Sequence, residues 1–233
     1  MGLFYEADKT FEQLMDEKKN FVFIGEAGSG KSEIVLNIAN KLAAKTGKQV
    51  DLFDLDQTKA AFRARDAQEE MEALGVELHY MPQLLDTPVL VNGIIPHLRR
   101  PDSLCILDVG GNENAARMVG CLSDHLNGDS SAALYVVNPY RPFSGTPEVM
   151  ELTMATVLNA CHIERIYFLL NPNIGPDTTE ADVRAGFAAA KCEAYGAFVP
   201  EALAERVSDA FPGEILPLHP YLIYPWNRNH SNS

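Results

Sequence analysis

The sequence predicts an α/β fold, in which a three-layer doubly wound sandwich surrounds a mostly parallel sheet. Short, nearly continuous apolar runs alternate along the chain with segments of helical periodicity. Strands that are apolar on both sides are typical of parallel sheets covered by helices on both faces. Repeated strand–helix–strand units joined by right-handed crossovers build such a sandwich. The 233 residues, 46% of them hydrophobic, suffice for a substantial core.

The first half of the chain alternates between predicted strands and helices. Residues 20–25 (NFVFIG) are mostly aromatic or β-branched, which favours a strand. Residues 32–45 place apolar side chains one, three and four positions apart, which predicts a helix with a buried face. The same criteria predict further helices over 8–18 and 58–74 and further strands over 49–55 and 76–80.

The second half repeats this alternation. Apolar runs such as SLCILDV and AALYVV predict strands over 103–109, 132–137, 163–170 and 215–218. Helical periodicity predicts helices over 114–126, 146–160 and 179–195. Because no Gly/Ser-rich linker or repeat interrupts the pattern, we expect one domain over residues 1–226, followed by a flexible polar tail over 227–233.

The charge and the cysteine content argue against several classes of protein. The formal net charge of −13 argues against a nucleic-acid or anionic-membrane partner, since both need clustered positive charge. No apolar run is long enough to span a bilayer, and the charged N-terminus does not resemble a signal peptide. The four cysteines and six histidines lack metal-site spacing. We therefore expect a reduced cytoplasmic protein without a structural metal.

The strongest signal is the segment GEAGSGKS at residues 25–32. It matches G-x-x-x-x-G-K-[ST] and lies between a predicted strand and a predicted helix, as a phosphate-binding P-loop does. Glycines let backbone N–H groups turn inward around a phosphate, and the helix N-terminus favours an anion. The predicted phosphate-binding residues are Gly25, Gly28, Ser29, Gly30, Lys31 and Ser32. Lys31 would contact the β- and γ-phosphates, and Ser32 would bind Mg²⁺.

Two carboxylates follow predicted strands at the edge where ligands bind in open α/β sheets. Asp108 ends an apolar strand and begins the sequence Asp-Val-Gly-Gly. The D-x-x-G pattern occurs in nucleotide switches, so Asp108 is the predicted Mg²⁺-site carboxylate, with Ser32 as the other metal ligand. Asp56 ends the strand after the P-loop helix; it would either orient the attacking water, alongside Lys31 in catalysis, or bind Mg²⁺ through water.

The P-loop, the Asp-Leu-Asp sequence at residues 54–56 and the Asp-Val-Gly-Gly sequence at residues 108–111 occur in an order that resembles the MinD/ParA/CobQ-type proteins. These belong to the SIMIBI class of P-loop NTPases, and several longer stretches resemble a ParA-like subgroup. The resemblance implies a Mg²⁺-dependent ATPase that can dimerise face to face over nucleotide. It also implies that Asp56 prepares the attacking water, that Asp108 supports Mg²⁺, and that Asn171, at the end of a strand, contacts the base.

One residue departs from this family. Many members carry a second lysine early in the P-loop, which reaches the partner's nucleotide, whereas this chain has Glu26 there. A carboxylate would repel a γ-phosphate, so another cation would have to serve. Arg63, Arg65 and Arg141 are the candidates, since guanidinium groups suit phosphate. Each is also compatible with a surface role.

The sequence alone leaves open which nucleotide binds and what the function is. The chain lacks the N-K-x-D motif of many GTPases and has Asn-Pro-Asn-Ile at residues 171–174, so ATP is favoured over GTP. The favoured function is a switch ATPase that regulates or loads a partner protein. The alternatives are a small-molecule P-loop kinase or ligase and a nucleotide-binding adaptor with negligible turnover.

Two segments that are rich in aromatic residues and proline each have two interpretations. Tyr140 and Phe143 lie in the loop after a predicted strand, where they suit either a partner-docking loop or a stiff packed connection. The cluster near the C-terminus suits either a ligand border or a strap on the core. Its members are Pro217, His219, Pro220, Tyr221, Tyr224 and Trp226.

Overall fold

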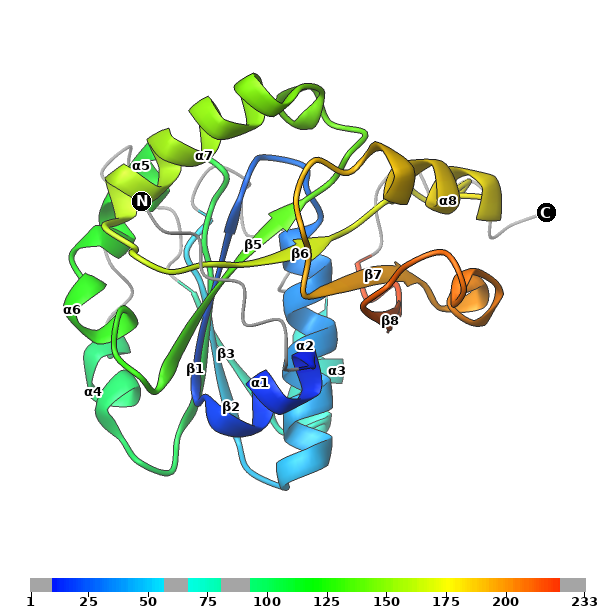
Figure 1. Ribbon diagram of the computed structural model, residues 1–233. Helices are drawn as coiled ribbons and strands as arrows, with labels where there is room; N and C mark the ends of the chain where they lie inside the picture. The colour runs from blue at the N-terminus through cyan, green and yellow to red at the C-terminus, as the bar shows by residue number, and fades with distance from the viewer. Residues whose placement is uncertain (1–9, 57–66, 81–92, 223–233) are drawn as a thin grey trace.

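The computed structural model describes residues 10–56, 67–80 and 93–222. Its centre is one eight-stranded sheet, and every described strand pair is parallel. The strand order is β3-β2-β4-β1-β5-β6-β7-β8, with helices on both sides (Figure 1). The strands are β1 (Asn20–Gly25), β2 (Val50–Asp54), β3 (Val76–Tyr80), β4 (Leu104–Asp108), β5 (Ser131–Val137), β6 (Tyr167–Leu170), β7 (Gly196–Pro200) and β8 (Glu214–Leu218). The predicted α/β fold is therefore confirmed, with an all-parallel sheet.

The helices vary in length from single turns to the long α2 and α7. Two of them begin with a capping box, in which Thr10 or Thr179 pairs reciprocally with the residue three positions later. The α-helices are α1 (Phe11–Glu17), α2 (Lys31–Thr46), α3 (Gln68–Ala73), α4 (Ile94–Arg99), α5 (Glu113–Gly120), α6 (Ser123–Leu126), α7 (Pro147–Cys161) and α8 (Glu180–Ala189). Short 3-10 turns are η2 (Pro142–Ser144), η3 (Glu201–Leu203) and η4 (Glu205–Val207).

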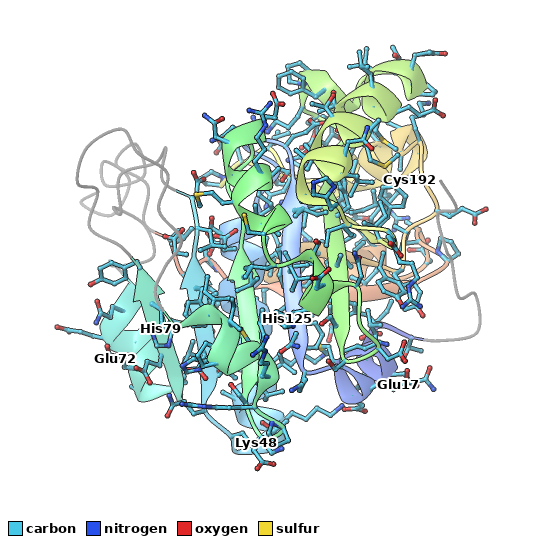
Figure 2. The ribbon with its side chains drawn as sticks, turned by 90° about the vertical axis from the view of Figure 1, so that its left-hand side faces the viewer. Glu17, Lys48, Glu72, His79, His125 and Cys192 are labelled. Atoms are coloured by element: carbon cyan, nitrogen blue, oxygen red, sulfur yellow. The ribbon has the colours of Figure 1, made fainter. Side chains whose placement is uncertain are left out.

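The sheet separates two apolar cores. In β1, Phe21 and Phe23 face a core shared with α1, α2 and α3, whereas Val22 and Ile24 face a core shared with α4 to α7. All four side chains are fully buried. Figure 2 looks onto the second face, with α4 to α7 towards the viewer and His79 at one side of the sheet. A strand buried on both faces has to be apolar throughout, which explains the unbroken run NFVFIG.

The segment after β8 is bound to α2. Asn37 on α2 exchanges two hydrogen bonds with the backbone of His219, at 2.9 and 2.8 Å. The backbone N–H of Leu222 donates to the buried Glu33 carboxylate at 3.1 Å, and the Tyr221 hydroxyl accepts from Asn40. Residues 219–222 therefore pack against the core, which is the second of the two interpretations of the C-terminal cluster. Tyr224 and Trp226 lie outside the described residues.

Several predicted boundaries differ from the structure. The helix predicted over 179–195 ends at Ala189 because Ala190 adopts an extended backbone, and β7 follows it as a strand that the prediction omitted. Helix α4 was also missed, since Gly93 and Pro96 flank and interrupt its short apolar pattern. The helix predicted over 114–126 divides into α5 and α6.

Other predictions are only partly covered by the structure. Of the helix predicted over 58–74, the described residues include α3 alone. The domain limits 1–226 and the tail 227–233 stay predictions, because residues 223–233 lie outside the described part of the chain. Within the described ranges, no helix combines the length and apolar character needed to cross a membrane.

Candidate functional site

The predicted P-loop connects β1, near the middle of the sheet, to α2. Strand β1 pairs with β4 on one side and β5 on the other, so three carboxyl ends meet beside the loop (Figure 1). The crevice outside the carboxyl ends of parallel strands is where ligands bind in such folds. The structure places the segment predicted to bind phosphate at this edge, and phosphate binding itself stays a prediction.

Lys31 is the first residue of α2, and its side chain folds back into the loop. Its ammonium group donates to the carbonyl of Gly25 at 3.0 Å and to the carbonyl of Glu26 at 2.7 Å. Only 5% of the residue is exposed. A buried lysine needs such acceptors, because an unpaired buried charge is costly. The loop thus holds one positive charge at its centre.

Two glycines of the site are required by close approaches. Gly30 caps α2 with φ of 92°, and a Cβ there would lie 2.1 Å from Nδ2 of Asn171. Gly111, from the Asp-Val-Gly-Gly segment, lies against the P-loop itself: a Cβ there would lie 2.2 Å from the backbone N of Ala27. A side chain at Gly111 would meet backbone atoms, and one at Gly30 would meet Asn171 and be strained by the positive φ. The segment after β4 and the P-loop are therefore in backbone contact.

The two predicted carboxylates come together next to this contact. Asp108 ends β4 and is 5% exposed, and its carbonyl accepts from the backbone N–H of Leu55 at 2.9 Å. That bond places the following residue, Asp56, over the same segment. The Asp56 carboxylate oxygen lies 2.9 Å from where a Cβ on Gly110 would be. The structure thus brings Asp56 and Asp108 to the same end of the sheet as the P-loop.

Asn171 and Arg141 reach the P-loop from the strands on the other side. Asn171 follows β6, is 3% exposed, and donates from its amide to the carbonyl of Ser29 at 2.8 Å. Arg141 follows β5 and donates from Nε to the carbonyl of Gly28 at 2.8 Å. Arg141 is therefore the candidate cation that the structure places on the loop, whereas Arg63 and Arg65 lie outside the described residues. A contact between Asn171 and a base stays a prediction.

Glu26 is the unusual residue of the loop. It is 5% exposed, and neither carboxylate oxygen has a hydrogen-bond partner among the described residues. Burial raises the pKa of Glu26 to about 6, although the nearby Lys31 lowers it. Burial also raises the pKa of Tyr135 on β5, with the Glu26 charge as a further cause. The carboxyl group therefore points into the protein beside Tyr135, which the sequence alone did not indicate.

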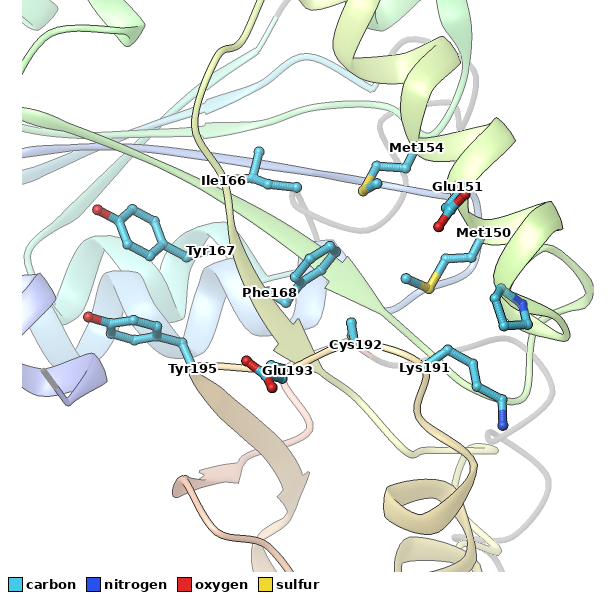
Figure 3. Close-up of a pocket in the computed structure, with 11 residues that line it drawn as sticks. Met150, Glu151, Met154, Ile166, Tyr167, Phe168, Lys191, Cys192, Glu193 and Tyr195 are labelled. Atoms are coloured by element: carbon cyan, nitrogen blue, oxygen red, sulfur yellow. The ribbon is translucent and has the colours of Figure 1, made fainter. Parts of the chain in front are cut away.

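A separate pocket of about 290 Å³ lies between α7, β6 and the segment before β7 (Figure 3). Met150 and Met154 face Phe168 across it, and Lys191 and Glu193 lie at its rim. None of its lining residues belongs to the P-loop or to the segments after β2 and β4. The pocket is thus distinct from the predicted phosphate site.

Comparisons with known proteins give the fold. No family model and no curated protein matches the sequence. Among solved structures, FtsY of Thermotoga maritima aligns with TM-score 0.50 and 17% identity, over 66% of this chain and 53% of that one. FtsY of Elizabethkingia anophelis in complex with GDP aligns with TM-score 0.50 and 17% identity, over 80% and 56%.

The fold is that of the P-loop NTPases. The sequence motifs predicted this fold, which both FtsY structures share. The chain spans about half the length of these two proteins. An identity of 17% shows the shared fold and leaves the MinD/ParA branch as a proposal.

Proposed function

We propose that this protein binds a Mg²⁺–nucleoside triphosphate at the P-loop and works as a switch ATPase of the MinD/ParA type that regulates or loads a partner protein. The observation that carries the proposal is the position of Lys31. Its ammonium group is held at the centre of a glycine-rich loop by two backbone carbonyls, at the N-terminus of a sixteen-residue helix. Phosphate oxygens are the natural acceptors for that group and for the surrounding N–H groups.

The remaining residues supply a metal site and a place for the attacking water. Ser32 and the buried Asp108 are oxygen donors at the P-loop edge, which suits Mg²⁺. When bound, Mg²⁺ neutralises charge on the transferring phosphoryl group. Asp56, beside Gly110 and half-buried, would orient water for slow hydrolysis. The segment after β4 touches the P-loop through Gly111. Hydrolysis at the loop would therefore act on that segment, as a nucleotide switch requires.

A protein partner is supported by apolar side chains exposed near the site. Tyr140 and Phe143 in the loop after β5 are 38% and 48% exposed, and this loop also carries Arg141, which contacts the P-loop. Ile174, after β6, is 48% exposed, and Asn138 joins the two loops by donating to the Asn173 carbonyl at 2.8 Å. Exposed apolar groups beside a nucleotide-sensitive loop suit a docking surface.

We propose that the site prefers ATP to GTP, because of the residues at 171–174. In this chain Asn171 is committed to the Ser29 carbonyl, and the motif that reads guanine in many GTPases is absent. A site without a partner for the guanine edge discriminates poorly in favour of GTP. FtsY of Elizabethkingia anophelis was solved with GDP, so both nucleotides belong in the test.

The test is calorimetric titration of the full chain with Mg-ATP and Mg-GTP. Lys31→Ala should abolish measurable binding, while far-UV circular dichroism stays unchanged. Lys45→Ala is the matched control, because Lys45 lies on the same helix and pairs with Asp16 at its surface. Undiminished ATP affinity in Lys31→Ala would refute the proposed site. Tighter binding of GTP than ATP would overturn the base assignment alone.

Glu26 favours one alternative, a nucleotide-binding adaptor with negligible turnover. A carboxylate buried in the loop adds negative charge where an ATPase of this class gathers positive charge. Release of phosphate by the wild type, measured together with molar mass with and without ATP, separates the two. Tight Mg-ATP binding without turnover would support the adaptor.

A further inference from the structure

Three polar side chains from separate elements meet at the edge of the sheet, away from the P-loop. Asp51 lies on β2, His79 on the neighbouring β3, and His97 on α4. The Asp51 carboxylate is 2.9 Å from Nε2 of His79 through one oxygen and 2.9 Å from Nδ1 of His97 through the other. One ligand atom from each residue lies within 4.8 Å of the other two. In the sequence these residues are too far apart to suggest a site.

We propose that Asp51, His79 and His97 bind a divalent transition metal ion, with Zn²⁺ as the expected ion. Two imidazole nitrogens and a carboxylate oxygen are ligands that zinc uses, and sites with three protein ligands leave a fourth position open. Ligands about 2.1 Å from a tetrahedral ion lie about 3.4 Å apart. The two carboxylate–imidazole contacts of 2.9 Å need to lengthen by about 0.5 Å, and the ligand atoms, which lie within 4.8 Å of one another, need to approach the same spacing.

The surroundings already hold the ligands in place. Phe53 stacks on the His79 ring, with centroids 4.4 Å apart, and meets the edge of the His97 ring at 5.5 Å. Ser103 donates its hydroxyl to the Asp51 oxygen that faces His97, at 3.0 Å. Partners of this kind orient metal ligands and are needed for full affinity. The cluster is thus arranged before any ion binds.

Charge and access also suit a cation. The Asp51 side chain is 6% exposed, while those of His79 and His97 are 21% and 17% exposed, which leaves a path from solvent. One carboxylate between two imidazoles also supplies the negative charge that favours a cation.

A further oxygen ligand lies close by. Glu77 is directly opposite Asp51 in the β2–β3 register, and its carboxylate is 4.0 Å from Nε2 of His79. Its side chain is 55% exposed, so it can turn towards an ion if it gives up the hydrogen bond that it accepts from Gln49. Glu77 or water can therefore complete a four-coordinate site.

The site is separate from the proposed nucleotide site. Asp51 is the second residue of β2, three positions before Asp54 at the carboxyl end of the strand, so the two sites lie about 10 Å apart along the strand. An ion here would join β2, β3 and α4 to one another. The proposal therefore does not depend on nucleotide binding.

The experiment is Zn²⁺ titration of the tag-free, metal-stripped full chain against a chromogenic chelator, with excess Mg²⁺ to fill sites for hard cations. We expect one Zn²⁺ per chain and an increase in melting temperature of roughly 5–10 °C at about 100 times the dissociation constant. His79→Gln and His97→Gln should each weaken binding at least about 100-fold, and Ser103→Ala roughly 10-fold.

The matched control is His219→Gln. His219 also pairs with a carboxylate, Glu201 at 3.1 Å, but that pair is exposed. Equal Zn²⁺ affinity in wild type, His79→Gln and His97→Gln would overturn the proposal. The three side chains would then have a structural role only. X-ray absorption of the Zn²⁺-loaded wild type provides a readout that does not depend on folded variants. Two imidazole ligands are expected, and sulfur ligation or a lack of imidazole would refute the site.

Discussion

The clearest prediction concerns the buried Glu26 in the P-loop. Replacing it with glutamine keeps the shape of the side chain and removes its ability to ionise. Burial raises the pKa of Glu26 from 4.5 to about 6 in the folded protein, so the folded state binds this proton more tightly than the unfolded state. Stability is therefore unaffected below pH 4.5 and falls as the pH rises from about 4.5 to about 6.

The size of the loss follows from the pKa difference. A difference of about 1.5 between folded and unfolded protein corresponds to about 2 kcal/mol in the free energy of unfolding. Because only 5% of Glu26 is exposed, little screening by solvent reduces this value. Relative to wild type, Glu26→Gln should thus gain about 2 kcal/mol between pH 4.5 and 6.5, and the gain should stay constant above that range.

The assay is urea unfolding of both proteins, without nucleotide, at half-unit steps from pH 4.5 to 7.5. Taking the difference between the two curves removes the contribution of the other titrating groups, Asp51 included. Glu164→Gln, at an exposed glutamate, should run parallel to wild type. A difference between Glu26→Gln and wild type that does not change with pH would refute the reasoning, because it would mean that Glu26 is not held in a desolvated site.

Three further predictions concern the same edge of the sheet. Asp56→Asn should lower turnover about 100-fold with little change in ATP affinity, and equal losses in both would give Asp56 a binding role. Arg141→Ala should weaken ATP binding about 10-fold, measured by calorimetry, whereas Arg117→Ala, in an exposed pair with Glu113, should have no effect. Glu26→Lys should lower the free energy of unfolding in urea, because it would bury a second cation beside Lys31; a stability equal to that of wild type would contradict the buried position of Glu26.

The sequence predicted the fold, which the structure confirms, and a phosphate loop, whose position at the sheet edge the structure gives; both predictions depend on local patterns. An unbroken apolar run such as residues 20–25 is enough to indicate a strand covered on both faces. The P-loop is a continuous segment, so its residues and their order can be read directly. Strand β7 was missed because Gly196 and Pro200, at its two ends, weaken the strand signal. Its pairing with β6 and β8, which no local pattern shows, is what makes it a strand.

Contacts between distant segments were beyond the sequence. The position of Arg141 on Gly28 and the cluster of Asp51, His79 and His97 depend on strand order and register. The only sequence signal for the cluster is polar residues within otherwise apolar strands, such as Asp51 in VDLFD. A buried charged residue needs partners, so this pattern could have prompted a search. It could not have identified which histidines lie nearby.

The central position of β1 has a consequence for how the protein opens. Because β1 is hydrogen-bonded on both sides, to β4 and β5, its amides exchange with solvent only after it separates from a neighbouring strand. Among the described strands, β3 and β8 lie at the edges with one neighbour each, so they can detach at a lower free energy. In hydrogen–deuterium exchange, the strand leading into the P-loop should exchange later than either edge strand. The loop that holds Lys31 would then stay anchored while the edges of the sheet fluctuate.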